Sequence, residues 1–374
     1  MEEKQHKRRV HYSGKYPRKF EEKYKEQNPE KYADTVAHVI SKGSTPAGMH
    51  ISIMVKEILD VLKIKPGEQG LDCTLGYGGH TRKMLEKLCA GLGGSTIGSI
   101  EDSVRQNAES ISSGGAKSGC VYGLDVDPIE SAKTVERLRN AGFGEDVFKF
   151  RLTNFANIDQ VAAEAGMFDF VLADLGVSSM QIDDPSRGFS YKIDGPLDLR
   201  LDPEHGESAA ERLHSISRDE FVGMMVENSD EPYAEEIADK VFNLMKKGEP
   251  MDTTTALRQA IESALWKVPK EERNDAVKKS CARVFQALRI DVNSELEVLY
   301  TFLEKLPGIL KPGARVAILT FHSGEDRLVK KAFKEGKKSG LYSDISEEVT
   351  RPSAEECRLN PRSRSTKLRW AVRA

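Results

Sequence analysis

Polar residues follow four short apolar runs of this sequence, and their carboxylate and amide groups are suited to hold a ligand. Asp72, Asp125 and Asp174 come directly after three of these runs, and Asn154 follows the fourth. A carboxylate at such a position accepts hydrogen bonds from hydroxyl or amino groups. In open sheets of parallel strands, ligands bind beyond the carboxyl ends of the strands. We therefore predict that these four positions meet at one ligand site.

A glycine-rich turn joins the first of these runs to a predicted helix. Gly76, Gly78 and Gly79 lie between Leu71 and Thr81 in the pattern Gly-x-Gly-Gly. Glycine has no Cβ atom and tolerates a positive φ, so the chain can turn sharply beneath a ligand. The pattern differs from the Gly-x-Gly-x-x-Gly of dinucleotide-binding folds, which argues against a nicotinamide dehydrogenase. An ordinary strand-to-helix turn is the alternative interpretation.

Two aspartates after the second run are given different roles. Asp125 stands where a carboxylate binds ribose hydroxyls in nucleoside-binding folds. Asp127 precedes Pro128, which is the order of a helix N-cap followed by a proline in the first turn. Asp125 lies farther along the chain from the glycine turn than the usual ~20 residues. Residues 91–118, which are rich in Gly and Ser, account for the excess as a predicted surface insertion.

The last part of the chain adds one histidine and a basic tail. His322 follows an apolar run at 315–321, so it either lines the predicted site or has a structural role. The tail 360–374 contains no acidic residue, and its apolar residues Leu368 and Trp370 alternate with polar ones. This alternation predicts a final strand. Its basic side chains either form a binding face or protect an exposed sheet edge.

The elements that must position these residues alternate between strands and helices. Short apolar runs indicate strands, and apolar residues at helical spacing indicate helices. We predict strands at 70–73, 120–125, 147–152, 168–174 and 315–321, and helices at 51–62, 81–88 and 295–306. This alternation is typical of a parallel sheet covered by helices on both faces. The predicted fold class is therefore α/β.

A helical region interrupts the predicted sheet. Apolar residues between 208 and 279 repeat at helical spacing and are expected in a core rather than in a binding site. The preceding segment 181–203 is dense in Pro, Gly and Asp, which predicts a long functional loop without regular elements. The predicted organisation is a basic extension at 1–48, a sheet domain at 49–180 and 288–374 with the insertion at 91–118, and an inserted helical domain at 181–287.

Composition and charge limit the class of protein. The chain has 374 residues, 39% hydrophobic and 31% charged, with a formal net charge of −3. Any nucleic-acid contact must therefore come from local basic patches. Residues 1–48 place Lys and Arg among Tyr, which predicts either a solvated extension or an arm that contacts RNA. We find no signal peptide and no apolar run of the roughly 20 residues that span a membrane, so no membrane partner is expected.

The cysteines indicate a reducing environment. The sequence has 5 cysteines, scattered and without a Cys-x-x-Cys pair. This pattern argues against a zinc site and against a disulfide framework. We therefore expect a cytoplasmic protein without a bound metal. The oligomeric state stays open, with a homodimer as one option.

Several motifs resemble those of one family, the MraW-type or H-type small-subunit ribosomal RNA methyltransferases. In chain order they are Thr74-Leu75-Gly76 through His80, Asp174 through Ser179, Arg187-Gly188-Phe189-Ser190, Asp194-Gly195-Pro196-Leu197-Asp198, Thr253 to Thr255, Phe285 through Ile290, Phe321-His322-Ser323 with Glu325-Asp326-Arg327, and Asn360-Pro361-Arg362. The resemblance extends from about residue 49 to residue 373. Tyr77, Met180 and Gly324 differ from the residues common in the family.

The resemblance implies a fold and an activity. The implied fold is a Rossmann-like S-adenosylmethionine-dependent methyltransferase sheet with a helical domain inserted after the fourth strand. The implied reaction moves a methyl group from S-adenosylmethionine to the N4 amino group of a decoding-centre cytidine in 16S rRNA, within the small ribosomal subunit. Two alternatives stay open: a methyltransferase for another RNA, a protein or a small molecule, and a non-catalytic ribosome-assembly factor.

The resemblance also implies site residues. For the cofactor they are Gly78, Gly79, His80, Asp125, Phe155, Asp174 and Gln181. Asp174 either accepts a hydrogen bond from the target amino group or only holds the cofactor. Further catalytic candidates are Ser178, Ser179 and His322, and the predicted phosphate contacts are Arg187, Arg289, Arg362 and Arg364.

Overall fold

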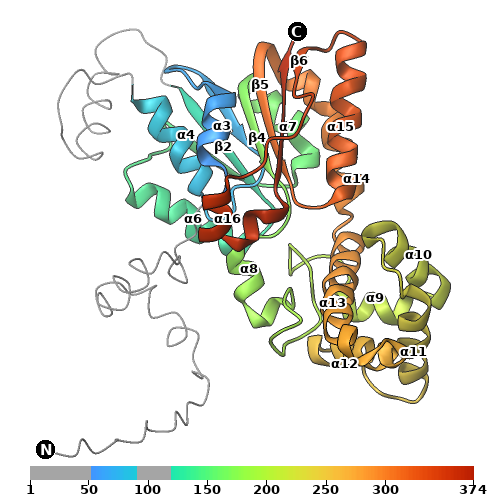
Figure 1. Ribbon diagram of the computed structural model, residues 1–374. Helices are drawn as coiled ribbons and strands as arrows, with labels where there is room; N and C mark the ends of the chain where they lie inside the picture. The colour runs from blue at the N-terminus through green and yellow to red at the C-terminus, as the bar shows by residue number, and fades with distance from the viewer. Residues whose placement is uncertain (1–51, 91–118) are drawn as a thin grey trace, which may run out of the picture.

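The computed structural model describes residues 52–90 and 119–374 (Figure 1). The predicted extension at 1–48 and the predicted insertion at 91–118 lie outside these residues. Within them, none of the helices combines the length and the apolar character needed to cross a bilayer.

A sheet of 7 strands forms the centre of the described chain, in the order β3-β2-β1-β4-β5-β7-β6. The strands are β1 (Gln69–Asp72), β2 (Cys120–Asp125), β3 (Phe148–Leu152), β4 (Phe168–Asp174), β5 (Leu310–Thr320), β6 (Tyr342–Ile345) and β7 (Lys367–Arg373). The strands from β3 to β5 in this order are parallel to their neighbours. The strand order reverses between β1 and β4, where open α/β sheets have their ligand crevice. The predicted α/β class and all five predicted parallel strands are confirmed.

The final strand, β7, lies inside the sheet. It pairs antiparallel with β5 on one side and with β6 on the other. The alternative of an exposed edge strand is therefore wrong, because β6 covers that edge. Arg369 of β7 is only 4% exposed, and its Nε atom donates to Oδ1 of Asp326 at 2.7 Å. Strand β6 is short and buries only Tyr342 and Ile345, which leaves too weak an apolar pattern to predict it.

Helices cover both faces of the sheet (Figure 1). One face carries α7 (Ile158–Ala165), α14 (Glu295–Lys305) and α15 (Ser323–Lys338), and the other carries α3 (Val55–Leu62), α4 (Gly79–Cys89) and α6 (Pro128–Asn140). Successive side chains of a strand point to opposite faces. In β4, Val171 and Ala173 pack in the first of these cores, while Phe170 and Leu172 pack in the second. The continuous apolar run of β4 is thus explained by burial on both faces.

A helical unit interrupts the chain between β4 and β5. Its helices are α8 (Ser179–Asp183), α9 (Ala209–Ser215), α10 (Arg218–Ser229), α11 (Ala234–Lys246), α12 (Thr254–Ala264) and α13 (Lys270–Val292), while α16 (Ala354–Leu359) lies later in the chain. Helices α9 to α13 enclose a core of their own, which includes Phe221, Met225 and Leu257. Figure 1 shows these helices beyond the carboxyl ends of the strands.

Two details of this unit differ from the sequence-based expectations. Residues 181–203 contain most of α8 and the 3-10 turn Pro185–Arg187, so this segment is not wholly irregular. Ser178 and Gln181 form a capping box that starts α8, a local signal that the density of Pro and Gly obscured. Helix α13 continues through the expected domain boundary at 287–288 without a break. The inserted unit therefore returns to the sheet along one continuous helix.

Candidate functional site

The carboxyl ends of β1, β2 and β4 border one cavity of about 380 Å³. Its lining contains most of the predicted site residues: Gly78, Gly79, His80, Asp125, Phe155, Asp174, Ser178, Ser179, Gln181, Arg289 and Arg362. Four predicted residues, Asp72, Arg187, His322 and Arg364, are not part of the lining of this cavity. The prediction for Asp72 is wrong, because its carboxylate is buried and accepts a hydrogen bond from the Thr81 hydroxyl group. The sheet edge thus brings together side chains that lie far apart in the sequence.

The glycine turn closes one end of the cavity. Gly78 is the N-cap of α4 and has φ 80°, a left-handed conformation that favours glycine. A Cβ atom at Gly79 would lie 2.0 Å from Oγ of Ser52. The backbone N–H of Gly76 donates to Oδ2 of Asp125 at 2.8 Å. The glycines therefore allow the turn to pack closely against its neighbours while its backbone holds the carboxylate of Asp125.

Asp125 ends β2 and faces the cavity. Besides the bond from Gly76, its Oδ1 atom accepts a hydrogen bond from the backbone N–H of Asp127 at 2.9 Å. Burial raises the pKa of Asp125 to about 6, although these backbone hydrogen bonds act in the opposite direction. Each carboxylate oxygen still has acceptor capacity, so Asp125 is suited to bind ligand hydroxyl groups.

Asp127 is buried and holds two parts of the protein together. Its Oδ1 atom accepts hydrogen bonds from the backbone N–H groups of Ile129 and Glu130, which confirms the predicted N-cap of α6. Its Oδ2 atom accepts from Nε2 of Gln181 at 2.9 Å and from Nη1 of Arg187 at 2.7 Å. Burial by itself would raise the pKa of Asp127, but the hydrogen bonds from Gln181 and Arg187 lower it. We call Asp127, Gln181 and Arg187 the Asp127 cluster.

The position of Arg187 corrects one predicted RNA contact. Its side chain is only 7% exposed in the ion pair with Asp127. Its Nη2 atom donates to the backbone carbonyl groups of Arg200 and Leu201 at 3.0 and 2.8 Å. The guanidinium is therefore directed inward and is not placed to meet a phosphate. Sequence alone did not reveal this role, because the partners lie in distant or irregular segments.

His80 and Asp174 form a pair in the lining of the cavity. Nδ1 of His80 lies 3.3 Å from Oδ2 of Asp174, and Nε2 lies 2.8 Å from the carbonyl oxygen of Ile53. A carbonyl and a carboxylate both accept hydrogen bonds, so the ring satisfies both partners only when both nitrogens carry hydrogen. Burial would lower the pKa of His80, but Asp174 and the Ile53 carbonyl raise it. Both partners of the His80 ring therefore favour its protonated form, which would pair with the carboxylate of Asp174.

Two further segments complete the sheet side of the cavity. The ring of Phe155 packs edge-on against Phe302, with centroids 5.3 Å apart and an interplanar angle of 82°. Ser178 accepts a hydrogen bond through Oγ from the backbone N–H of Gln181 at 3.2 Å. Oε1 of Gln181 in turn accepts from the backbone N–H of Ser178 at 2.9 Å. Both polar ends of the Gln181 side chain are therefore bonded within the protein, one of them to Asp127.

The opposite wall comes from the segment between α13 and α15. Nε and Nη2 of Arg289 donate to the two carboxylate oxygens of Glu295 at 2.7 and 2.9 Å. Burial would lower the pKa of Arg289, but the charge of Glu295 raises it. The Arg289 side chain is 16% exposed in this pair. The predicted phosphate contact of Arg289 is therefore corrected, because its guanidinium is bound to an internal carboxylate.

Three lining residues of this wall were missed by sequence reasoning: Asn293, Glu295 and Glu325. Asn293 and Glu295 follow shortly after the motif that ends at Ile290, and Glu325 lies within the motif around His322. In the sequence, these three residues stand out only as polar residues near the boundaries of helices. Nothing in the spacing indicated that they face one cavity.

The two remaining predicted RNA contacts lie near the C-terminus. Arg362 has a side chain that is 42% exposed, and its Nη2 atom donates to Oδ1 of Asp183 at 2.9 Å. Arg362 lines the cavity, and Arg364 is exposed on the same 3-10 turn, Pro361–Ser365. Both side chains are accessible to a large ligand that approaches the cavity from outside.

Comparison with known proteins places this architecture in a family. The profile of the MraW methylase family matches residues 47–108 and 108–374. Ribosomal RNA small subunit methyltransferase H 1 of Agathobacter rectalis is 63% identical over 373 residues, which are 100% of this chain and 99% of that protein. The protein of the same name from Lachnoclostridium phytofermentans is 60% identical over 99% of this chain and 93% of its own length. Ribosomal RNA small subunit methyltransferase H 2 of Alkaliphilus metalliredigens is 54% identical over 100% of this chain and 99% of its own length. The chain belongs to the MraW methylase family.

Proposed function

We propose that the protein transfers a methyl group from S-adenosylmethionine to the N4 amino group of a decoding-centre cytidine in 16S rRNA. Its family membership and the names of its relatives support methylation of small-subunit ribosomal RNA. The choice of N4 and of the decoding centre rests on the motif resemblance. The observation that carries the proposal is the single cavity shared by Asp125, Phe155 and Asp174 at the reversal point of the sheet.

The residues of the cavity fit S-adenosylmethionine. Asp125 has acceptor capacity left for the ribose hydroxyl groups, and the fixed ring of Phe155 offers an apolar surface to adenine. The turn at Gly78 and Gly79 leaves room for the methionine portion. When bound, the cofactor supplies a methyl group on a positively charged sulfur atom.

Asp174 is the proposed hydrogen-bond acceptor for the target amino group. The lone pair of that nitrogen is delocalised into the cytosine ring, so alignment and a fixed acceptor assist its reaction. His80 orients the Asp174 carboxylate through Nδ1. Ser178 and Ser179 line the same cavity and are further candidates for contact with the base. A stacked base must leave its stack to reach this cavity, which costs a few kcal/mol.

The accessible arginines support contact with the RNA backbone. Arg362, which lines the cavity, and the exposed Arg364 lie on one 3-10 turn and remain the proposed phosphate contacts. Arginine suits this role because its planar guanidinium matches phosphate geometry. The proposed location is the cytoplasm, where ribosomal subunits are assembled.

The test is a labelling experiment with three substrates. Radiolabelled S-adenosylmethionine is incubated with naked 16S rRNA, immature 30S particles and mature 30S subunits, and the labelled nucleotide is identified by mass spectrometry. We expect N4-methylcytidine at one decoding-centre position. The Asp125→Ala variant should lose the label, while Arg151→Ala, which breaks a surface pair with Glu164, should retain it.

Three outcomes would overturn parts of the proposal. Label on another position or on another base would contradict the proposed specificity. Cofactor binding without label in any RNA would exclude the rRNA substrate and favour a protein or small-molecule acceptor. Absence of cofactor binding by the folded protein would instead favour a ribosome-assembly factor without catalysis.

A further inference from the structure

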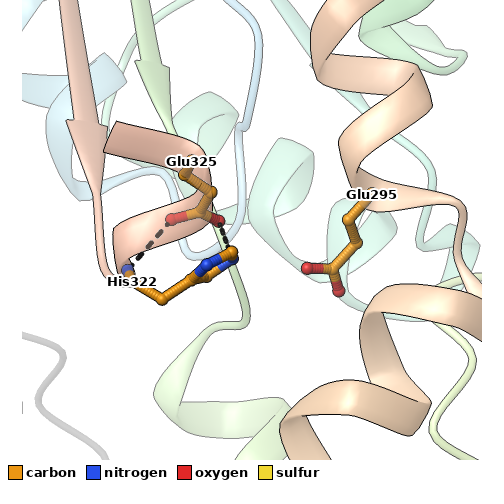
Figure 2. Close-up of side chains that lie close together, drawn as sticks. All are labelled: Glu295, His322 and Glu325. Atoms are coloured by element: carbon orange, nitrogen blue, oxygen red, sulfur yellow. Dashed lines mark hydrogen bonds and ion pairs between the residues drawn. The ribbon is translucent and has the colours of Figure 1, made fainter. Parts of the chain in front are cut away.

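Three side chains from two separate segments converge on the helical side of the cavity. Glu295 is the first residue of α14, His322 precedes α15, and Glu325 lies in the first turn of α15. One donor atom from each of the three lies within 4.8 Å of the others. Figure 2 shows the Glu295 carboxylate directed from the facing helix toward the imidazole of His322. We call these residues the His322 cluster.

The imidazole of His322 is buried without adequate partners. Its side chain is 9% exposed, and both ring nitrogens lack a hydrogen-bond partner within the described part of the chain. Nε2 lies 3.2 Å from Oε1 of Glu325, which makes an ion pair when the ring is protonated, while Nδ1 has no partner among the described residues. Buried polar atoms are almost always satisfied, so an unsatisfied pair of nitrogens beside two carboxylates calls for a ligand.

The two carboxylates are already held in position by outer partners. Oε2 of Glu325 accepts hydrogen bonds from the backbone N–H groups of Phe321 at 2.7 Å and His322 at 3.3 Å. Glu295 is fixed by the two hydrogen bonds from Arg289. Carboxylates that bind metals are typically oriented in this way by a second layer of hydrogen bonds. Arg289 is the guanidinium that pairs with Glu295, so the two carboxylates of the cluster outnumber the guanidinium beside them.

We propose that Glu295, His322 and Glu325 bind a divalent first-row transition-metal cation such as Mn²⁺ or Zn²⁺. Imidazole nitrogen together with carboxylate oxygen is a donor set for these ions rather than for Mg²⁺ or Ca²⁺, which prefer oxygen alone. Three protein ligands leave at least one coordination position open. Because Glu295 and Glu325 line the cavity, a ligand in the cavity has access to this ion.

The proposed site departs from the expectation of a metal-free protein. That expectation rested on the scattered cysteines, whereas this donor set contains no cysteine. Its ligands come from two helix starts separated by the whole of β5, so no short spacing in the sequence announces them. The inference does not depend on the methyl-transfer proposal, because it concerns binding of the ion alone.

Metal titration of the full chain tests the proposal. The purified protein, free of affinity tags, is treated with a chelator and dialysed. Mn²⁺ binding is followed by electron paramagnetic resonance of the free ion, and Zn²⁺ binding by calorimetry. We expect one equivalent of at least one of the two ions to bind to the wild-type protein. His322→Ala and Glu295→Gln should each weaken this binding at least about tenfold.

A surface variant provides the matched control. His205 and Asp202 form an exposed histidine–carboxylate pair at 2.8 Å, so His205→Ala should leave the tight equivalent unchanged. Thermal melting of each variant verifies that it is folded. The proposal is overturned if neither ion binds to the wild-type protein. It is equally overturned if the folded His322→Ala and Glu295→Gln variants bind the ion as tightly as the wild-type protein does.

Discussion

The cavity has a sheet wall, formed at the carboxyl ends of the strands, and a helical wall, formed by the segment between α13 and α15. These two walls are built in different ways. On the sheet wall, Asp125 and Asp174 stand at the ends of parallel strands, and each lines the cavity. On the helical wall, Arg289 and Glu295 come from different helices and bind each other through two hydrogen bonds. The sheet wall therefore keeps acceptors available to a ligand, whereas the helical wall uses much of its polar capacity internally.

This difference separates two functions of buried charge. A carboxylate held by backbone N–H groups retains lone pairs, as Asp125 does, and remains ready for a ligand. A carboxylate paired with a buried guanidinium, as in the Asp127 cluster, stabilises the contact between two elements instead. Substitutions at the two kinds of position should consequently affect different measurements.

The largest effect should follow from breaking the Asp127 cluster. Arg187→Leu leaves the buried carboxylate of Asp127 without its cation, which should lower the free energy of unfolding by about 3–5 kcal/mol. Urea denaturation measures this change. Arg151→Leu is the control, because the exposed Arg151–Glu164 pair should contribute no more than about 1 kcal/mol. Equal destabilisation by both variants would refute a special role for the buried pair.

The second-largest effect should be on the rate of methyl transfer. Asp174→Asn keeps the shape of the side chain but weakens the proposed acceptor, and we expect roughly 100-fold slower methyl transfer. Cofactor affinity should change by less than about threefold, because the acceptor interaction belongs to the substrate. Single-turnover rates and calorimetry with S-adenosylhomocysteine measure the two quantities. Comparable losses in both would show that Asp174 only holds the cofactor.

The third effect concerns pH. The raised pKa of Asp125, about 6, means that its carboxylate takes up a proton as the pH falls through 6 rather than near the ordinary value. The ionised carboxylate accepts stronger hydrogen bonds from ribose hydroxyl groups than the protonated form does, so cofactor affinity should be constant above this range. Below it, affinity should fall by at most about tenfold per pH unit. Calorimetry with S-adenosylhomocysteine between pH 5 and 8 measures this profile.

The Asp125→Asn variant supplies the control for that profile. His80, whose pKa is also raised, lies in the same cavity and remains unchanged in this variant. If Asp125 causes the acid limb, the variant should bind more weakly and show a flatter profile. An acid limb of undiminished slope in Asp125→Asn would assign the dependence to His80 or another group.

The smallest effect should come from the 3-10 turn that carries Arg362 and Arg364. Arg362→Glu and Arg364→Glu should each reduce the slope of log K against log salt for RNA binding by about 1. Arg151→Glu, on a different surface, should leave the slope unchanged. A slope that is insensitive to the substitutions at Arg362 and Arg364 would remove these residues from the RNA interface.

The comparison of the two walls also shows what a sequence reveals. Apolar runs ended by polar residues predicted the parallel strands, and the strand ends then located Asp125 and Asp174 at one edge. Local patterns also identified Asp127 as a helix cap. These predictions succeeded because the relevant interactions join neighbours in the chain or follow from the regular geometry of a sheet.

The sequence-based predictions that failed have a common physical cause. Arg187 and Arg289 were taken for phosphate contacts because an arginine near a site has the same local pattern whether it faces solvent or a buried carboxylate. Asp127 lies far from Arg187 in the sequence, and Glu295 begins the helix that follows Arg289. Strand β6 was missed because its half-exposed sequence gives little periodicity. Tertiary partners decide these cases, and one sequence does not display them.

Helix α13 has a mechanical consequence. Its 23 residues, at about 1.5 Å each, extend for roughly 34 Å. Arg289 lies in its last turn, beside the cavity, while the other end belongs to the inserted unit. A tilt of about 5° around Arg289 would therefore displace the distant end, about 28 Å away, by about 2.5 Å. Because α13 is one continuous helix, a tilt at its Arg289 end in the helical wall would also shift the inserted unit at its other end.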